Sequence, residues 1–214
     1  MIFRLDKRLI FPDPSRAEAD GLLAVGGDLS SERLMLAYQN GIFPWYDENT
    51  PILWYSPHER LVLFPGELKI SKSMRQVLHS GKFTVTKDQC FDKVIESCSV
   101  IKRNGQAGTW LTAEMKEAYI RLHTEGHAHS IETWEQDKLV GGLYGIQLCS
   151  VFCGESMFSL VSNASKAALI TLATSSLYNL IDCQVHTEHL ESMGARMISR
   201  KEYMAILQNA RVKG

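Results

Sequence analysis

Two short apolar stretches that carry polar residues constrain this chain more than any other feature of its sequence. Residues 148–158 read Leu-Cys-Ser-Val-Phe-Cys-Gly-Glu-Ser-Met-Phe, and residues 180–185 read Leu-Ile-Asp-Cys-Gln-Val. Their length and apolar character predict two buried strands. Glu155 lies in the first stretch. Asp182 and Gln184 lie two residues apart in the second, so they should face the same side of a strand.

Carboxylates on buried strands allow two interpretations. An unpartnered carboxylate is costly inside a protein, so such a group is either paired in a structural network or part of a functional site. Glu155 and Asp182 could each pair with a nearby Arg or Lys and simply stabilise the fold. Three polar groups on two apolar strands favour a site, and we expect Glu155, Asp182 and Gln184 to form it.

The composition limits the class of protein. The chain has 214 residues, of which 45% are hydrophobic, and this is enough for one large domain or two small ones. The net charge of −1 produces no global basic field, so nucleic-acid binding requires a local patch. Lys69, Lys72, Arg75 and Lys82 form a basic cluster that could contact phosphates, with a solvated helix face as a nearly equal alternative.

Cysteine and histidine usage points to a reducing environment without metal. The five cysteines include no Cys-x-x-Cys pair and fall mostly in apolar runs, which indicates a cytoplasmic protein without a disulfide framework. The first residues lack the apolar core of a signal peptide, and no apolar run is long enough to span a membrane. The pairs His127/His129 and His186/His189 have no obvious third ligand, so we expect no metal site.

The order of predicted elements indicates an α+β fold. Apolar spacing and capping residues predict helices near residues 30–41, 71–81, 88–98, 112–122, 163–178, 186–193 and 199–207. Strands are expected at 52–55 and 61–64, as a hairpin-like pair, and at 83–85, 127–134, 139–148, 148–158 and 180–185. The sequence pattern changes near residues 69–83. We therefore expect a small N-terminal domain, residues 1–68, and a second domain, residues 69–214.

The second domain has the element order of coenzyme A-dependent N-acetyltransferases, with antiparallel strands followed by a helix, a strand and a helix. In those enzymes a glycine-rich loop after the central strand cradles pyrophosphate. The corresponding loop here, residues 159–166, contains no glycine, so its backbone amides cannot approach a pyrophosphate as closely. We expect an acetyltransferase-like mixed sheet with flanking helices, a donor other than coenzyme A, and no cofactor.

Nine sequence blocks occur in order along nearly the whole chain. They are Gly-Leu-Leu-Ala-Val-Gly-Gly-Asp-Leu (21–29), Gly-Ile-Phe-Pro-Trp-Tyr (41–46), Trp-Tyr-Ser-Pro (54–57), Gly-Thr-Trp-Leu-Thr (108–112), Gly-His-Ala-His-Ser-Ile-Glu (126–132), Leu-Val-Gly-Gly-Leu-Tyr-Gly (139–145), Phe-Cys-Gly-Glu-Ser-Met-Phe-Ser (152–159), Asn-Ala-Ser-Lys (163–166) and Leu-Ile-Asp-Cys-Gln (180–184). Together they resemble the bacterial leucyl/phenylalanyl-tRNA–protein transferase family.

The resemblance implies an activity and two macromolecular partners. It implies a cytoplasmic monomer that moves Leu or Phe from aminoacyl-tRNA to proteins whose N-terminal residue is Lys or Arg, and it leaves Met open as a third donor residue. The modified protein then enters degradation by the N-end rule. Because an ester becomes an amide, the reaction is downhill and needs neither a metal nor an external energy source.

The resemblance also suggests how the acceptor is held. Asp182 and Gln184 are implied to form the catalytic centre, where a carboxylate holds the acceptor ammonium and an amide orients the neutral amine. Whether Gln184 relays a proton or only positions the amine stays open. Glu155, together with Asp182, is expected to bind the acceptor and to face its cationic side chain.

The donor should meet apolar and aromatic residues. Phe152, Gly154 and Met157 are expected to line the pocket for the Leu or Phe side chain. Trp45 and Trp110 are expected to contact the terminal adenosine or the donor side chain, because bases stack on aromatic rings. Two other functions compete with this hypothesis: a coenzyme A-dependent acetyltransferase, disfavoured by the glycine-free loop, and a non-catalytic reader of basic N-termini.

Overall fold

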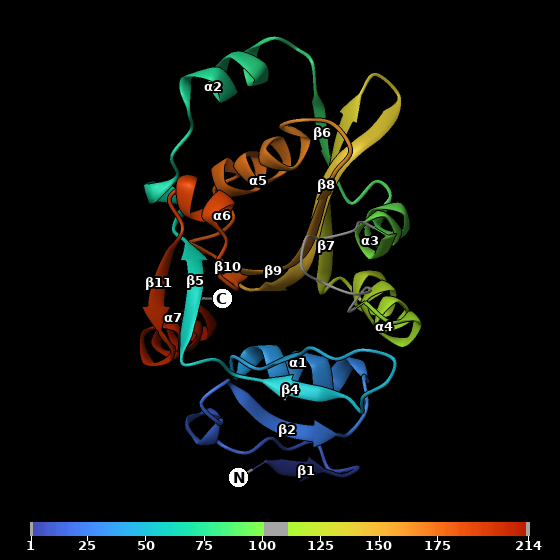
Figure 1. Cartoon of the computed structure of the whole chain (residues 1–214), viewed down its shortest axis with the longest axis vertical. Helices are drawn as coiled ribbons and strands as arrows, with labels where there is room; N and C mark the ends of the chain where they lie inside the picture. The colour runs from blue at the N-terminus through green and yellow to red at the C-terminus, as the bar shows by residue number, and fades with distance from the viewer. Residues whose placement is uncertain (1, 101–110, 213–214) are drawn as a thin grey trace.

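The computed structural model describes residues 2–100 and 111–212, which form two β-sheets with helices around them (Figure 1). The smaller sheet has the order β1-β2-β4-β3 and is built from the first quarter of the chain. Its strands are β1 (Phe3–Leu5), β2 (Leu22–Gly26), β3 (Phe43–Pro44) and β4 (Leu53–Tyr55). Helix α1 (Ser31–Gln39) and the 3-10 turn η1 (Pro14–Arg16) complete this part.

The larger sheet is mixed and has the order β11-β5-β10-β9-β8-β7-β6. Strands β6 to β9 pair antiparallel in sequence order, β9 and β10 pair parallel, and β5 pairs antiparallel with both β10 and β11. The strands are β5 (Glu59–Leu63), β6 (Thr84–Lys87), β7 (Ala128–Glu135), β8 (Lys138–Leu148), β9 (Val151–Ser159), β10 (Leu180–Gln184) and β11 (Arg196–Ser199).

Helices cover both faces of the larger sheet. Figure 1 shows α5 (Ala164–Thr174) on one face, and α3 (Phe91–Val100) and α4 (Ala113–Thr124) on the other. The remaining helical segments are η2 (Pro65–Glu67), α2 (Lys72–His79), α6 (Glu188–Ser192) and α7 (Arg200–Val212). Within the described ranges, no helix has the length and apolar character required to cross a membrane.

The two sheets share one hydrophobic cluster. It contains Leu34 and Trp54 from the smaller sheet and its helix, and Tyr119 and Tyr144 from the larger sheet and the helix α4. All four side chains are fully buried. A second cluster, which includes Leu169 of α5, fills the opposite face of the larger sheet. The smaller sheet is therefore packed against the rest of the protein rather than held by a linker.

The predicted helix starts agree with the capping observed. The hydroxyl of Ser71 accepts a hydrogen bond from the Met74 amide, at 3.1 Å, at the start of α2. Ser199 accepts one from the Glu202 amide, at 3.2 Å, as the predicted capping pattern of the last helix requires. The helix expected over residues 163–178 ends at Thr174, whose hydroxyl donates back to the Ile170 carbonyl.

The predicted hairpin of residues 52–55 and 61–64 is wrong. Strand β4 belongs to the smaller sheet and β5 to the larger one, so the segment between them crosses from one sheet to the other. The Ser56 amide donates to the Gly21 carbonyl at 2.8 Å, which holds this segment against the smaller sheet. The sheets thus change between Tyr55 and Glu59, while the division into domains at residue 69 stays a prediction.

Candidate functional site

The parallel pairing of β9 and β10 stops at the residues that the sequence singled out. Leu180, Ile181 and Asp182 pair with Val151, Phe152 and Cys153, and the pairing goes no further. On β10 the register against β5 shifts between Asp182 and Gln184, and Gln184 has a positive φ of 60°. Asp182 and Gln184 therefore reach the same region through a β-bulge, not through the regular alternation that we expected.

A second bulge lies on the neighbouring strand. Tyr144 of β8 pairs with Ser156, and Gly145 pairs with Gly154, so Glu155 is the extra residue that has no partner in the register. A bulge of this kind bends the strand and redirects a side chain. The two bulges lie on adjacent strands just beyond the end of their pairing. Together they bring Glu155 and Gln184 to one another.

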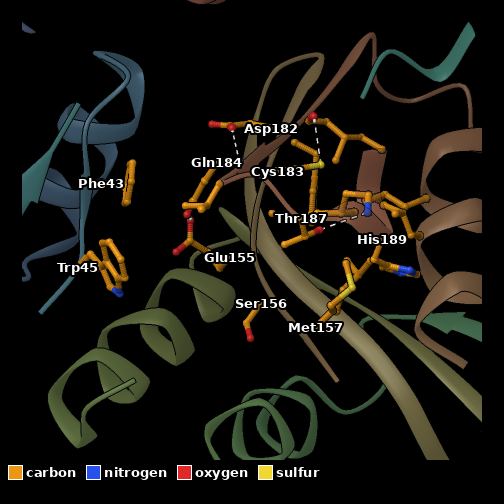
Figure 2. Close-up of a pocket in the computed structure, with 18 of the residues that line it drawn as sticks. Phe43, Trp45, Glu155, Ser156, Met157, Asp182, Cys183, Gln184, Thr187 and His189 are labelled. Atoms are coloured by element: carbon orange, nitrogen blue, oxygen red, sulfur yellow. Dashed lines mark hydrogen bonds between the residues drawn. The ribbon is translucent and has the colours of Figure 1, made fainter. Parts of the chain in front are cut away.

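Glu155 is held by two hydrogen bonds. Gln184 donates from Nε2 to Oε1 at 2.7 Å, and Tyr119 donates from its hydroxyl to Oε2 at 2.9 Å (Figure 2 shows the first). The Tyr119 hydroxyl is in turn 2.5 Å from that of Tyr38. Burial, with a smaller contribution from the charge of Asp182, raises the pKa of Glu155 to about 7, although hydrogen bonding by Tyr38, Tyr119 and Gln184 lowers it.

Asp182 has a different environment. Its Oδ2 atom accepts hydrogen bonds from Arg60 Nη1 at 3.2 Å and from the Tyr203 hydroxyl at 2.7 Å. Its Oδ1 atom accepts one from the backbone amide of Gln184 at 2.8 Å. The Asp182 and Arg60 side chains are only 2% and 3% exposed, so this is a buried ion pair. Of the two carboxylates, Asp182 therefore has the structural partner that the alternative interpretation required.

A cavity of about 560 Å³ opens beside these residues. Figure 2 shows Phe43 and Trp45 on one side of Glu155 and Gln184, with Met157 and His189 on the other. The apolar part of the wall comes from strands β8 to β10 and helices α5 and α6: Leu143, Phe152, Met157, Leu169, Leu172, Ile181 and Leu190. Its size and lining are typical of a small-molecule site.

Most predicted site residues surround this one cavity. Trp45, Phe152, Gly154 and Met157 line it together with Glu155, Asp182 and Gln184. Trp45 is 41% exposed and packs edge-on against the Tyr55 ring, with 5.7 Å between the centroids. Trp110 lies outside the described residues.

The predicted basic cluster lies elsewhere. Lys69, Lys72, Arg75 and Lys82 are exposed on and around α2, which Figure 1 shows beyond α5. None of the four lines the cavity. Lys82 lies 3.7 Å from Glu135, and this ion pair is exposed. The cluster and the cavity are therefore separate parts of the surface, and phosphate contact at the cluster stays a prediction.

Besides residues of the apolar wall, five residues that hold or flank the polar centre were not predicted: Phe43, Arg60, Tyr38, Tyr119 and Tyr203. The tyrosines came from helices whose apolar spacing indicated only core. Arg60 had a usable signal, because it opens the apolar run Leu-Val-Leu-Phe of a buried strand. A charge at that position requires a buried partner, and the partner is Asp182.

Backbone amides of the segment before α5 form hydrogen bonds within that segment. The Ser165 amide donates to the Ser159 hydroxyl at 3.3 Å, and the Ala164 amide donates to the Val161 carbonyl at 3.2 Å. Asn163 takes the left-handed conformation directly before the helix. Amides that would have to face a pyrophosphate are thus turned toward neighbouring residues of the same segment.

Comparison with known structures supports the fold. The chain is similar to FemX with a TM-score of 0.50 over 79% of this chain and 66% of FemX, at 9% sequence identity. A likeness at this identity concerns the fold alone. The prediction of an α+β protein, with a small N-terminal domain before an acetyltransferase-like mixed sheet, is confirmed.

Comparison with known sequences is more specific. The family model for leucyl/phenylalanyl-tRNA protein transferase matches residues 62–208, and the model for the N-terminal domain of the same family matches residues 27–58. A leucyl/phenylalanyl-tRNA–protein transferase from Flavobacterium johnsoniae is 56% identical over 97% of this chain and 100% of that protein. One from Syntrophobacter fumaroxidans is also 56% identical, over 96% of this chain and 89% of that protein. The chain therefore belongs to the leucyl/phenylalanyl-tRNA–protein transferase family, as its sequence blocks predicted.

Proposed function

We propose that this enzyme transfers Leu or Phe from aminoacyl-tRNA to the α-amino group of proteins that begin with Lys or Arg. One observation carries the proposal: Gln184 is held by two carboxylates at the wall of a largely apolar cavity, its backbone amide by Asp182 and its side-chain amide by Glu155. The apolar wall suits a Leu or Phe side chain, and the polar centre suits an amine. The two substrates would thus meet where these surfaces join.

The donor would occupy the apolar part of the cavity. Phe152 and Met157 offer a wall for its side chain, and Trp45 offers an exposed ring to the terminal adenosine. Stacking of a base on an aromatic side chain is worth about 1–3 kcal/mol. The ester carbonyl would then lie near Gln184, between the apolar wall and the aromatic side chains.

The reaction requires a well-positioned amine more than it requires a strong base. A free α-amino group has a pKa of about 7.7–8.0, so roughly a tenth of it is already neutral at pH 7. Because Gln184 Nε2 donates to Glu155, its carbonyl oxygen is the end of the amide that can accept a hydrogen bond from the amine. The enzyme would orient the nucleophile in this way. As the new C–N bond forms, the ester C–O bond breaks, and the proton that the amine loses goes to the departing ribose oxygen of the tRNA.

The acceptor's positive charge would be recognised by Glu155. In the part of the chain that the structure describes, Asp182 forms an ion pair with Arg60, whereas no Lys or Arg forms one with Glu155. Glu155 is therefore the carboxylate with charge to offer a bound Lys or Arg side chain. Asp182 would act mainly by holding Gln184 and by its charge near the ammonium.

Transfer of labelled Leu from tRNA to an Arg-initiated peptide tests the activity directly. We expect labelled peptide with Arg or Lys at the first position and much less with Gln or Met. Binding of the peptide without transfer would instead favour a non-catalytic reader of basic N-termini. Transfer that is equal for all four peptides would contradict selection by charge.

Glu155→Gln tests the proposed acceptor contact. A charge-assisted hydrogen bond contributes about 1.5–3 kcal/mol, so kcat/KM on Arg- and Lys-initiated peptides should fall by about 10- to 100-fold. Binding of aminoacyl-tRNA should change little. An unchanged preference for Arg over Gln in the variant would show that Glu155 does not read the acceptor.

A further inference from the structure

The guanidinium of Arg60 lies where the two sheets meet. Arg60 is 2% exposed and opens the buried part of β5. Its Nη1 atom lies 3.2 Å from Asp182 Oδ2 on the larger sheet. Its Nη2 atom donates to the Gly41 carbonyl at 2.6 Å, in the segment that leads into β3 of the smaller sheet. One side chain therefore joins strand β10 to the edge of the other sheet.

Two aromatic rings enclose the same guanidinium. The Arg60 Cζ atom is 4.6 Å from the centre of the Phe43 ring and 4.9 Å from that of Tyr203. Both distances are within the range of cation–π attraction. Phe43 lines the cavity, and the Tyr203 hydroxyl donates to the Asp182 oxygen that Arg60 also contacts. The Arg60 guanidinium thus contacts both Phe43 of the cavity wall and Asp182 of strand β10.

The backbone at Gly41 makes this arrangement possible. Gly41 has a φ of +66°, and a Cβ there would lie 2.8 Å from the Met204 sulfur and 3.3 Å from the Tyr203 ring. The positive φ favours glycine, and a larger residue would push against α7, which lies behind the carbonyl that reaches Arg60. Phe43 follows two residues later and lines the cavity, so the Gly41 contact lies directly beside this aromatic wall.

The orientation of Gln184 depends on Asp182, which is the second partner of Arg60. Asp182 Oδ1 accepts the Gln184 amide at 2.8 Å and thereby stabilises its positive φ. Gln184 then donates to Glu155. The contacts run from Arg60 through Asp182 to the Gln184 backbone, which carries the side-chain amide that would meet the amine.

We propose that Arg60 is a positioning residue for aminoacyl transfer, which fixes the aromatic donor wall and the Asp182–Gln184 pair relative to each other. This inference rests on the proposed function. The role depends on the two ends of the Arg60 guanidinium. Nη2 holds the smaller sheet through the Gly41 carbonyl, and Nη1 holds strand β10 through Asp182. A positive charge alone would hold only one of them.

Two substitutions of Arg60 distinguish the geometry of its two contacts from its positive charge. Arg60→Lys keeps the charge, but an ammonium cannot reproduce the planar pair of contacts to Asp182 and Gly41. Arg60→Met removes the charge and leaves the Asp182 carboxylate buried without a cation, which is energetically costly. The groups that face Arg60 are Asp182 on β10, Tyr203 on α7, and Cys153 and Glu155 on β9.

Arg33 supplies a matched control. It is also fully buried, and its Nη2 atom donates to the carbonyls of Asp6 at 2.8 Å and Arg8 at 3.2 Å. It is not part of the cavity wall. Arg33→Lys should therefore weaken the packing of the smaller sheet without moving the reacting groups.

The experiment compares wild type, Arg60→Lys, Arg60→Met and Arg33→Lys in two measurements. These are the single-turnover rate with saturating Leu-tRNA and Arg-initiated peptide, and the Kd of a non-hydrolysable leucyl-adenosine analogue. For Arg60→Lys we expect the rate to fall by about 10- to 100-fold, because small displacements of reacting groups have effects of that order. We also expect weaker binding of the analogue. Arg33→Lys should lose stability yet keep both values.

The two Arg60 variants together give a second readout. Arg60→Met should lose more of its rate than Arg60→Lys, because it leaves the buried Asp182 carboxylate without any cation beside it. Arg60→Lys alone decides the question if Arg60→Met does not fold. Wild-type rate and affinity in Arg60→Lys, or equal losses in Arg33→Lys, would overturn the positioning role. A wild-type protein without any transfer would instead refute the proposed function.

Discussion

Replacing Glu155 with Gln should change how the stability of the protein depends on pH. Glu155 is 8% exposed, and its burial is the main cause of a pKa of about 7, against the ordinary value of 4.5. In the unfolded chain the same carboxyl group is solvated and ionises near its ordinary pKa. The folded protein therefore keeps a proton that the unfolded chain has already released.

The sign of the effect follows from this difference in bound protons. Stability falls with increasing pH wherever the folded state binds more protons, so wild type should lose stability between about pH 4.5 and 7. Each pKa unit corresponds to about 1.4 kcal/mol, which gives a loss of about 3 kcal/mol over this range. A neutral amide at position 155 cannot ionise and should avoid this loss.

Urea denaturation of both proteins at several pH values measures the effect. The two should have similar unfolding free energies at about pH 5, and the variant should be more stable by up to about 3 kcal/mol at about pH 8. A matching comparison with Glu135→Gln, a half-buried carboxylate on the same sheet with a surface ion pair to Lys82, controls for the general effect of losing a negative charge. Parallel curves for wild type and Glu155→Gln would refute the reasoning, because they would mean that Glu155 ionises normally in the folded protein.

Three further results are expected. Asp182→Ala and Gln184→Ala should each lower the single-turnover rate far more than they weaken binding of a leucyl-adenosine analogue, since both residues are proposed to hold the amine rather than the donor; normal rates would rule out their assignment. Combining Lys72→Glu with Arg75→Glu should weaken binding of aminoacyl-tRNA at low salt but not binding of the short analogue, because phosphate contacts depend on salt; equal losses on both ligands would indicate a folding defect. Gly145→Ala should lower the melting temperature strongly, because a Cβ there collides with a backbone carbonyl of β9; a melting temperature like that of wild type in thermal unfolding would contradict this packing.

The sequence located the centre of the site because its signal is local. Glu155, Asp182 and Gln184 are polar residues inside short apolar runs, and such a conflict is visible without any knowledge of the fold. The helices were predictable for the same reason, because caps such as Ser71 and apolar spacing act within a few residues. What the local pattern indicated correctly was where the unusual residues are.

The partners of these residues could not be predicted locally. Arg60 and Asp182 are 122 positions apart in the sequence, and the pairing of β5 with β10 in the larger sheet brings them together. The bulges at Glu155 and before Gln184 were missed because regular alternation was assumed for both strands. Strands β1 and β11 have three and four residues, too few for alternation to be recognised.

The hydrophobic cluster shared by the two sheets makes the whole chain one cooperative unit. Separating the sheets would expose the apolar faces that Leu34 and Trp54 share with Tyr119, so neither part is expected to persist alone. The cavity takes Phe43 and Trp45 from one sheet and Glu155, Asp182 and Gln184 from the other. A partly unfolded or clipped molecule should therefore lose the cavity, and the proposed transfer activity would measure how much of the protein has both sheets folded together.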